Sequence, residues 1–426
     1  MRKIFILLAA LALVPACQGV SPHELDSFDP EGGVSYTLRQ GRSAKRGVSF
    51  NFGSLPDIDI PLLGSAVSWS YDWSNRVPSE ASQAQFGKFG MDWCPMIWNG
   101  NYNPENIRAW KKAHPEALYI LAFNEPNLKD QANMTPAQAA ELWPAVVSLA
   151  KELNMKLVSP ALNYGTLEGY HDPIKWMDEF LAQPQVSADD FVAIALHCYM
   201  PSASSVKDFI DMFAKYGKPV WLTEFCNGNS SNISEADQLR YMCETMNMLE
   251  AHENVFRYAW FMPRGSFNTK WHNNLLTSKE PFELTTLGKV FVNLSTYDSS
   301  VVYGSREIIP AEQYSSASYR VHLAPCTDRN GGILEISELP KDSWVEYKVN
   351  LPTAGNYKVY LRYYTYRETS LAISLNGTDV AAKKIPSSSK EWVTNYFNLD
   401  FPAGESTIRL TGNSGATIAL NWISVR

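Results

Sequence analysis

The sequence predicts an α/β fold, in which a (β/α)8 barrel is followed by an all-β sandwich of the jelly-roll kind. Two observations predict the barrel: eight short apolar runs, and the helical segments that alternate with them over about 250 residues. A third observation predicts the sandwich, because the runs after residue 306 are short, often alternate in polarity and are separated by turn residues. At 426 residues the chain is too long for one ordinary core, which agrees with two domains.

We expect the barrel over residues 46–298. Most of its predicted strands are continuously apolar, as strands buried on both faces should be. No glycine-rich phosphate loop follows any of them, which disfavours a doubly wound open sheet. The eight strands are predicted at residues 46–52, 66–73, 89–99, 118–126, 156–164, 191–200, 219–225 and 256–264.

Helix signals separate several of these strands. Thr135, Pro136 and Gln138 supply an N-cap, a proline at the first helical position and a capping-box partner. Gly217 is suited to end a helix in the left-handed conformation, and Ser234 caps the start of another. The pattern therefore places a helix after most of the strands.

The sandwich is expected over residues 303–426. Turns such as Asn376–Gly377 separate its strands. It contains no acid pair or histidine cluster that would suggest a second active site, so a binding or spacer role is expected.

The N-terminal segment predicts export. Residues 1–17 combine two basic residues with an apolar stretch too short to span a membrane, which is typical of a signal peptide. The end of this stretch also resembles a bacterial lipobox, in which Cys17 would carry the lipid. We expect a lipoprotein at the bacterial cell surface or in the periplasm, with plain secretion as the alternative. Polar residues 18–45 are predicted to be a tether or a loosely attached strand.

Composition narrows the partners. A net charge of −7 and the lack of a basic run argue against nucleic acid, so a neutral polysaccharide or oligosaccharide is the expected substrate. The membrane is expected to be reached only through the lipid anchor, and the protein is expected to be a monomer.

The cysteines show no C-x-x-C spacing, so a zinc site is not expected. Export permits disulfides, and Cys226 with Cys243 is the pair to test. Buried free thiols that pack as small hydrophobic groups are the equally weighted alternative.

Two glutamates end two of the apolar runs. Glu125 follows the run of residues 118–124, and Glu224 lies at the end of 219–225. Placing a carboxylate beside a buried strand is unfavourable unless it has partners or its pKa rises. Because the C-terminal ends of barrel strands share one mouth, the two carboxyl groups should face each other there. Such a pair can perform glycoside hydrolysis, in which one group donates a proton and the other attacks or activates water.

The surrounding motifs resemble a known family. The stretches LAFNEPN, LVSPALN, HCYM, WLTEF and RYAWFMPRG occur in order between residues 46 and 294 and are similar to glycoside hydrolase family 128, the compact endo-β-1,3-glucanases of the retaining clan A. The resemblance implies that Glu125 is the acid/base and Glu224 the nucleophile. It also implies that Asn124 binds the sugar 2-hydroxyl and that Tyr199 orients Glu224.

The same resemblance implies further sugar contacts. Trp260 would form the floor under the reacting sugar, and His197 could line the same subsite. A satisfied core position is the alternative for Tyr199, Trp260 and His197. Lower-ranked contacts near strand ends are Trp69, Trp73, Trp98, Asn99 and Asn163.

The expected reaction keeps the anomeric configuration. The two carboxyl groups should then lie about 5 to 5.5 Å apart, and Glu125 should have the higher pKa because the charge of Glu224 raises it. No cofactor or metal is required.

The C-terminal segment resembles family 6 carbohydrate-binding modules through PAEQY, the stretch DSWVEYKVNLPTAGNYKVYLRY and LNWISV. Trp392 matches one aromatic of their sugar clamp. The asparagine expected two residues before Asn421 is replaced by Ala419. Glu312 matches a residue of the modules' calcium site, although Pro310 replaces an acidic neighbour, so a structural calcium ion is a possibility there.

Three alternatives stay open. The same chemistry could act on mannan, galactan or a mixed-linkage glucan, with either endo or exo action. The chain could instead be a non-catalytic surface glycan-binding protein, although both glutamates would then be unexplained. A metal-dependent barrel hydrolase is weaker, because the histidines show no H-x-H or H-x-x-E-H spacing.

Overall fold

The computed structural model describes residues 38–228, 232–265, 268–389, 391–413 and 416–426. The predicted signal segment, the predicted lipid site at Cys17 and most of the predicted tether lie outside these residues. No helix within the described ranges is both long and apolar enough to cross a membrane.

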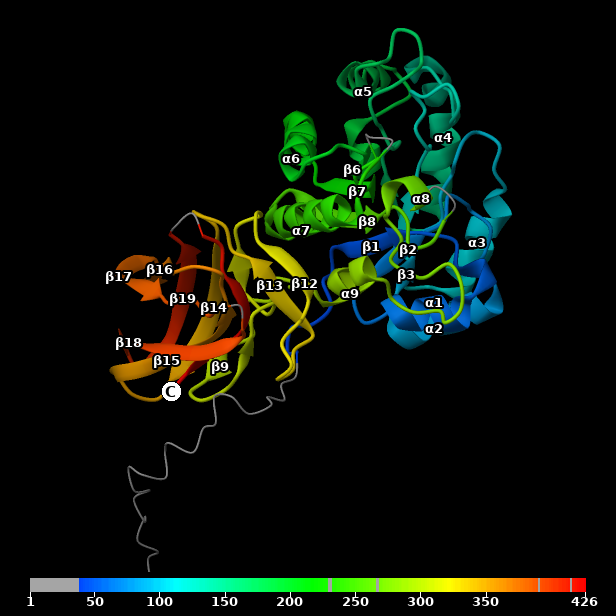
Figure 1. The fold of residues 1–426 in the computed structure, drawn as a ribbon. Coiled ribbons are helices and arrows are strands. Elements are labelled where there is room, and N and C mark those ends of the chain that lie inside the picture. The colour runs from blue at the N-terminus through cyan, green and yellow to red at the C-terminus, as the bar shows by residue number, and fades with distance from the viewer. Residues whose placement is uncertain (1–37, 229–231, 266–267, 390, 414–415) are drawn as a thin grey trace, which may run out of the picture.

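Eight parallel strands form the predicted barrel (Figure 1). Their order in the sheet is β3-β2-β1-β8-β7-β6-β5-β4, and a parallel bridge between Met96 and Leu121 joins its two ends. The strands are β1 (Arg46–Ser49), β2 (Trp69–Tyr71), β3 (Asp92–Trp93), β4 (Tyr119–Leu121), β5 (Lys156–Val158), β6 (Phe191–Cys198), β7 (Val220–Phe225) and β8 (Val255–Trp260). The (β/α)8 prediction is confirmed, although most strands are shorter than the apolar runs.

Helices surround the barrel, and several begin where the sequence signals predicted. Thr135 with Gln138, and Ser234 with Asp237, form complete capping boxes, while Gly217 has a left-handed backbone. The helices are α1 (Pro56–Leu63), α2 (Glu80–Phe89), α3 (Pro104–Ala113), α4 (Pro136–Glu152), α5 (Pro173–Leu181), α6 (Ala203–Met212), α7 (Glu235–Ala251), α8 (Asn268–Trp271) and α9 (Thr286–Asn293), with 3-10 turns at Phe52–Ser54, Ala188–Asp190 and Phe213–Tyr216.

The barrel interior is filled by its own apolar cluster. Trp69 and Trp221 are both fully buried there, with ring centroids 5.1 Å apart. The Arg257 guanidinium lies over both rings, 5.5 and 4.8 Å from their centroids, and pairs with Asp92 at 2.5 Å. The lower barrel is therefore a packed core, and space for a ligand remains at the opposite mouth.

The C-terminal part is a two-sheet β-sandwich. One sheet has the order β12-β13-β20-β15-β18 with β10 beside β20, and the other has β11-β14-β19-β16-β17 with β9 beside β14. Its strands are β9 (Tyr303–Gly304), β10 (Ile309–Pro310), β11 (Ser316–Ala317), β12 (His322–Pro325), β13 (Leu334–Glu338), β14 (Trp344–Leu351), β15 (Gly355–Tyr364), β16 (Thr369–Leu375), β17 (Thr378–Ile385), β18 (Val393–Phe401), β19 (Gly404–Gly412) and β20 (Ala419–Val425). The predicted all-β region is thus confirmed.

The sandwich packs against α7 and α9 of the barrel (Figure 1). Buried Asn247, on α7, donates to the Val321 carbonyl over 3.1 Å and accepts from the Tyr314 hydroxyl over 2.8 Å. His322 lies between Glu244 of α7, at 2.8 Å, and Glu338 of β13, at 3.0 Å. Polar contacts therefore fix the two domains against each other.

Residues 38–45, the described part of the predicted tether, also pack against both domains. Gln40 donates to the Tyr314 carbonyl in the sandwich and accepts from Thr296 after α9. Arg42 donates to the carbonyls of Val67 and Gly90 on the barrel. This part of the chain is therefore a packed strap, and the prediction of a loose tether is wrong here.

Cys226 and Cys243 are free and buried, so the predicted disulfide is wrong. Cys243 faces the sandwich, where its sulfur lies 3.4 Å from the Leu323 amide nitrogen, whereas Cys226 lies 3.6 Å from the Asn273 amide. Burial raises the pKa of the Cys243 thiol to about 12, which keeps it protonated and unreactive. Both thiols behave as the small buried groups of the alternative prediction.

Candidate active site

A cleft of about 500 Å³ opens at the mouth of the barrel. It lies at the C-terminal ends of the strands, where barrel enzymes carry their active sites. Aromatic and aliphatic side chains form most of its wall, and amides and two carboxyl groups converge on it. The lining residues are Trp73, Trp98, Asn124, Glu125, Leu128, Gln131, Asn163, Tyr199, Glu224, Phe261, Met262 and Trp271.

The two predicted carboxyl groups meet in this cleft. Glu224 lies within β7, and Glu125 follows four residues after the end of β4. They are 4% and 7% exposed, respectively, so both are almost removed from water. The backbone of Glu125 is left-handed, with φ of 43°, a conformation that costs about 1–3 kcal/mol for a residue other than glycine. The surrounding fold therefore holds Glu125 in a strained position beside Glu224.

His197, at the end of β6, lies between the two carboxylates. Its Nδ1 is 3.0 Å from Oε1 of Glu125, and its Nε2 is 3.4 Å from Oε1 of Glu224. Both contacts are within ion-pair distance when the imidazole is protonated. The imidazole is fully buried and faces two carboxylates at once.

This arrangement sets the protonation of the site. Burial alone would lower the pKa of His197, but the charges of Glu224 and Glu125 outweigh burial and raise the pKa. Burial alone would raise the pKa of Glu125, yet the His197 charge and the Asn163 amide, 3.3 Å away, lower it overall. The pKa of Glu125 is therefore lowered and not raised as predicted, because the His197 imidazole adjoins the carboxylate.

Three donors surround the Glu224 carboxylate. Tyr71 donates to Oε1 over 2.9 Å, the Trp73 indole donates to the same oxygen over 2.6 Å, and Tyr199 donates to Oε2. Trp73 reaches this oxygen from a left-handed backbone with φ of 58°. The donors stabilise the anionic form of Glu224 and fix the plane of its carboxylate.

Other predicted contacts also lie in the cleft. Trp98 and Asn163 line it, and Asn124 donates to Gln131 over 3.1 Å while its buried Oδ1 has no partner among the described residues. That oxygen can accept a hydrogen bond from a bound hydroxyl group.

Two tryptophans that the sequence predicts as sugar contacts do not line the cleft. Trp69 is fully buried in the barrel interior and donates to the Lys45 carbonyl over 3.0 Å. Trp260 is also fully buried and donates to the Asn273 carbonyl over 2.9 Å, on the side of β8 that packs towards Tyr241 of α7. The residue after it, Phe261, lines the cleft in its place.

Trp392 and Glu312 belong to the sandwich. Trp392 donates to Thr327 over 3.2 Å, and its ring centroid is 5.9 Å from that of Tyr364. Glu312 is fully buried, and burial raises its pKa to about 8, so it is protonated at neutral pH. No group of three or more potential ligands occurs in the described part of the chain. Glu312 therefore belongs to no such group among the described residues, and nothing in the structure supports the expected calcium ion.

Sequence reasoning missed Phe261 and Trp271 as cleft residues, and Tyr71 as a buried donor to Glu224. A period-two signal was present for Tyr71, because Trp69, Tyr71 and Trp73 alternate along one strand and therefore share its inward face. The same argument applies to Phe261, because successive side chains along a strand point to opposite faces and Phe261 directly follows the outward-facing Trp260. Trp271 lies on the short helix α8, for which the sequence had no signal.

A pair of buried carboxyl groups in a sugar-sized cleft at this end of a barrel defines a glycoside hydrolase. The glycosyl hydrolase catalytic core family matches residues 47–291. A family 128 subgroup II endo-β-1,3-glucanase from Pseudomonas viridiflava is 36% identical, with a TM-score of 0.54 over 59% of this chain and 98% of that one. A second subgroup II endo-β-1,3-glucanase, from Sorangium cellulosum, is 31% identical, with a TM-score of 0.50 over 58% and 97%.

A curated relative, Alkali-sensitive linkage protein 1 of Schizosaccharomyces pombe, is 25% identical over 258 residues. The aligned region is 59% of this chain and 45% of the relative, so the chain spans less than half of that protein's length. The chain belongs to the glycosyl hydrolase catalytic core family, and its barrel belongs to glycoside hydrolase family 128.

Proposed function

We propose that the chain hydrolyses β-1,3-glucan within the polymer and retains the anomeric configuration. The observation that carries this proposal is the Glu125–His197–Glu224 cluster in the cleft. One imidazole ring contacts both carboxylates, which is compatible with the short separation of about 5–5.5 Å in retaining enzymes. Likeness to two endo-β-1,3-glucanases supports the linkage and the mode of action.

Glu224 is the nucleophile in this proposal. Its carboxylate accepts hydrogen bonds from Tyr71, Trp73 and Tyr199, and it attacks the anomeric carbon. The glycosidic bond breaks as the departing oxygen takes a proton, and a glycosyl ester forms on Glu224. Water then attacks the ester at the anomeric carbon and releases the sugar with its original configuration.

Glu125 transfers the proton in both steps. Because His197 lowers the pKa of Glu125, the proton of the resting site resides on the imidazole. Nδ1 of His197 lies 3.0 Å from Oε1 of Glu125, so Glu125 can pass this proton to the leaving oxygen. In the second step Glu125 accepts a proton from water and returns it to Nδ1 of His197, which restores the resting state.

The decisive experiment uses the protein without its first 17 residues and four polymers: laminarin, curdlan, barley β-glucan and mannan. Products are resolved by chromatography over time, and their anomers by proton NMR. We expect a ladder of short β-1,3-gluco-oligosaccharides whose first-formed anomer is β. Products from mannan alone would overturn the linkage, accumulation of glucose alone would overturn endo action, and an α first product would overturn retention.

We also propose that the sandwich binds sugar at a cluster of aromatic side chains. Tyr364 has ring centroids 5.2 Å from Tyr366 and 5.9 Å from Trp392, and Tyr366 is 66% exposed. Exposed aromatic faces of this kind suit stacking on pyranose rings. The test is retention of the full chain on insoluble curdlan in a Glu224→Ala background, which should fall when Trp392→Ala is added.

Export as a lipoprotein is a further proposal, supported by residues 1–17 alone. Mass spectrometry of the protein expressed in a Gram-negative host should find a diacylglycerol group on Cys17. Recovery of an unlipidated protein that begins elsewhere would support plain secretion instead.

A further inference from the structure

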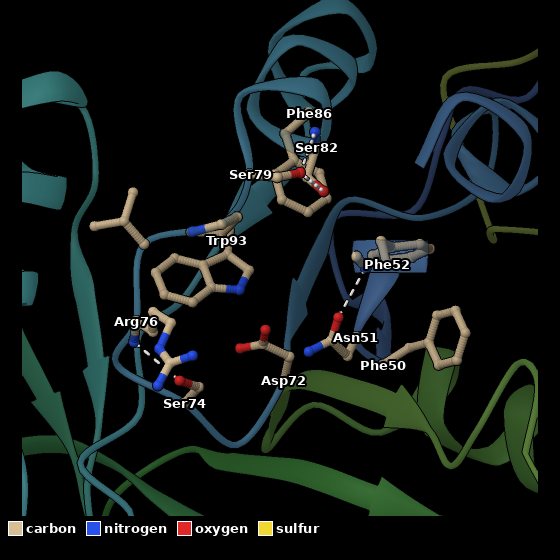
Figure 2. Close-up of a pocket in the computed structure, with 13 residues that line it drawn as sticks. Phe50, Asn51, Phe52, Asp72, Ser74, Arg76, Ser79, Ser82, Phe86 and Trp93 are labelled. Carbon is tan, nitrogen blue, oxygen red and sulfur yellow. Dashed lines mark hydrogen bonds between the residues drawn. The ribbon is translucent and has the colours of Figure 1, made fainter. Parts of the chain in front are cut away.

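A second pocket lies against the segment that follows β2 (Figure 2). Its volume is about 220 Å³, less than half that of the cleft. Aromatic side chains form its walls and polar groups lie between them. The lining residues are Phe50, Asn51, Phe52, Gly53, Asp72, Ser74, Arg76, Val77, Pro78, Ser79, Ser82, Phe86 and Trp93.

Asp72 is the unusual group in this pocket. Its carboxylate points into the space between Trp93 and Asn51 (Figure 2), and its Oδ1 is buried without a hydrogen-bond partner among the described residues. Burial raises the pKa of Asp72 to about 6, although the Trp93 side chain and the Ser74 backbone partly offset this effect. A buried oxygen of this kind lowers stability unless a donor binds to it.

The polar groups indicate a neutral ligand that both donates and accepts hydrogen bonds. Asp72 supplies an acceptor, while the exposed Arg76, which lies near Trp93 and Ser74 in Figure 2, supplies donors. A bare anion would face the Asp72 carboxylate, and a cation would face Arg76. The hydroxyl groups of a sugar can donate to Asp72 and accept from Arg76, while the apolar face of its ring packs against the aromatic walls.

The location connects this pocket to the polymer. Asp72 and Trp73 are consecutive, and they face opposite sides of the same wall: Trp73 lines the cleft and contacts Glu224, whereas Asp72 lines the second pocket. The volume is below the range of about 300–1,000 Å³ typical of drug-sized ligands, which suits one monosaccharide ring.

We infer that this pocket binds a single neutral hexopyranose unit of the polysaccharide, a distal or side-chain sugar that lies outside the catalytic cleft. The inference rests on the proposed function for the identity of the polymer. The ring packs against Trp93 and Phe52, one hydroxyl donates to Oδ1 of Asp72, and Arg76 donates to a second sugar oxygen.

The first test measures binding without catalysis. Full-length Glu224→Gln protein labelled with ¹⁵N-tryptophan is titrated with methyl β-D-glucopyranoside, and the indole signals are assigned by Trp93→Phe and Trp98→Phe. We expect the Trp93 signal to shift with an affinity that falls at least fivefold in Asp72→Ala and in Arg76→Ala. Asp57→Asn, which alters an exposed acid on the neighbouring α1, should leave the affinity unchanged.

The second test measures catalysis on two substrates. On laminarin, Asp72→Ala and Arg76→Ala should each raise KM several-fold. An aryl laminaribioside is confined to the cleft, so on this substrate kcat and KM of both variants should stay within twofold of wild type. Equal losses on both substrates would show that the residues act only through Trp73, and this would overturn the inference. A Trp93 signal unmoved by the sugar would also overturn it. Failure of hydrolysis with a normal Trp93 shift would reject the proposed function and leave the pocket standing.

Discussion

The Tyr71 hydroxyl, on β2, donates a hydrogen bond of 2.9 Å to Oε1 of Glu224, on β7. Tyr71 is fully buried, and the adjacent carboxylate raises the pKa of its phenol beyond the effect of burial. The phenol therefore stays a donor at every working pH. This contact places a donor on Glu224, the proposed nucleophile, without occupying the cleft.

Tyr71→Phe should lower kcat about 10- to 100-fold and leave KM within about twofold, because a hydrogen bond to a charged group contributes about 1.5–3 kcal/mol. Initial rates on a soluble β-1,3-glucan provide the measurement. Tyr170→Phe, which removes a hydroxyl bonded to Glu179 on the outside of the barrel, is the matched control. A wild-type rate for Tyr71→Phe would contradict the role of this donor.

The two catalytic glutamates should respond differently to the leaving group. Glu224→Ala should abolish turnover on every substrate, with an unchanged circular dichroism spectrum. Glu125→Ala should lose about 10²–10⁴-fold on glucan and less on an aryl glycoside, because a good leaving group needs little protonation. Mild and equal losses in both variants would contradict the assignment of Glu125 as acid/base and Glu224 as nucleophile.

The pH profile should depend on His197. The raised pKa of His197 places the basic limb of kcat/KM above the ordinary histidine value of about 6.5. In His197→Gln the proton must reside on Glu125, so the basic limb should move to lower pH. Profiles of the two proteins on one aryl substrate test this, and coincident basic limbs would show that His197 does not hold the proton.

The raised pKa of His197 also predicts how its contribution to stability depends on pH. A histidine whose folded pKa is raised stabilises the fold below its unfolded pKa, and this contribution disappears as the pH rises through the folded pKa. His197→Gln should therefore lose more stability at pH 6 than at pH 9. Thermal melts of both proteins at the two pH values provide the comparison.

Asp72→Asn should stabilise the protein at neutral pH by about 1–3 kcal/mol. The folded pKa of about 6 exceeds the unfolded value, so the cost of the carboxylate appears as the pH rises from about 4 to 6. Denaturant unfolding at pH 3.5 and 7.5 should show equal stabilities at the lower pH and a more stable variant at the higher pH. A variant that is less stable at pH 7.5 would show that Asp72 stabilises the fold instead.

Asn247→Ala should destabilise the contact between barrel and sandwich by about 2–4 kcal/mol, because the Val321 carbonyl and the Tyr314 hydroxyl lose a buried partner together. Calorimetry should then resolve a sandwich transition below that of the barrel. One unchanged transition would mean that the apolar contacts alone hold the interface.

Much of the fold was readable because its signals are local. Capping boxes at Thr135 and Ser234 and eight apolar runs specify the barrel, and the two glutamates follow from where such runs end. The direction of each side chain was not readable. In a continuously apolar strand either parity can face inward, so Trp260 was assigned to the cleft although it packs against the helices.

The electrostatics of the site were also beyond the sequence. His197 could be placed at the end of a strand, but its contact with both carboxylates depends on the angles at which three strands meet in the barrel. For this reason the sequence predicts a raised pKa for Glu125, whereas the structure lowers it.

The junction between β3 and β4 closes the barrel with little backbone pairing. Leu121 N bonds to the Pro95 carbonyl over 3.0 Å, Ile97 N to the Leu121 carbonyl over 2.8 Å, and Asn124 N to the Trp98 carbonyl over 2.9 Å, and β3 itself spans two residues. Amide hydrogens along this seam should exchange with solvent before those of β6 to β8, which form longer ladders. Trp98 and Asn124 lie above the seam and also line the cleft, so opening of the seam would widen the cleft before the rest of the barrel loosens. A bound glucan that contacts Trp98 and Asn124 would hold the two edges of the seam together. Substrate binding should therefore slow hydrogen exchange most at the amides of Ile97, Leu121 and Asn124.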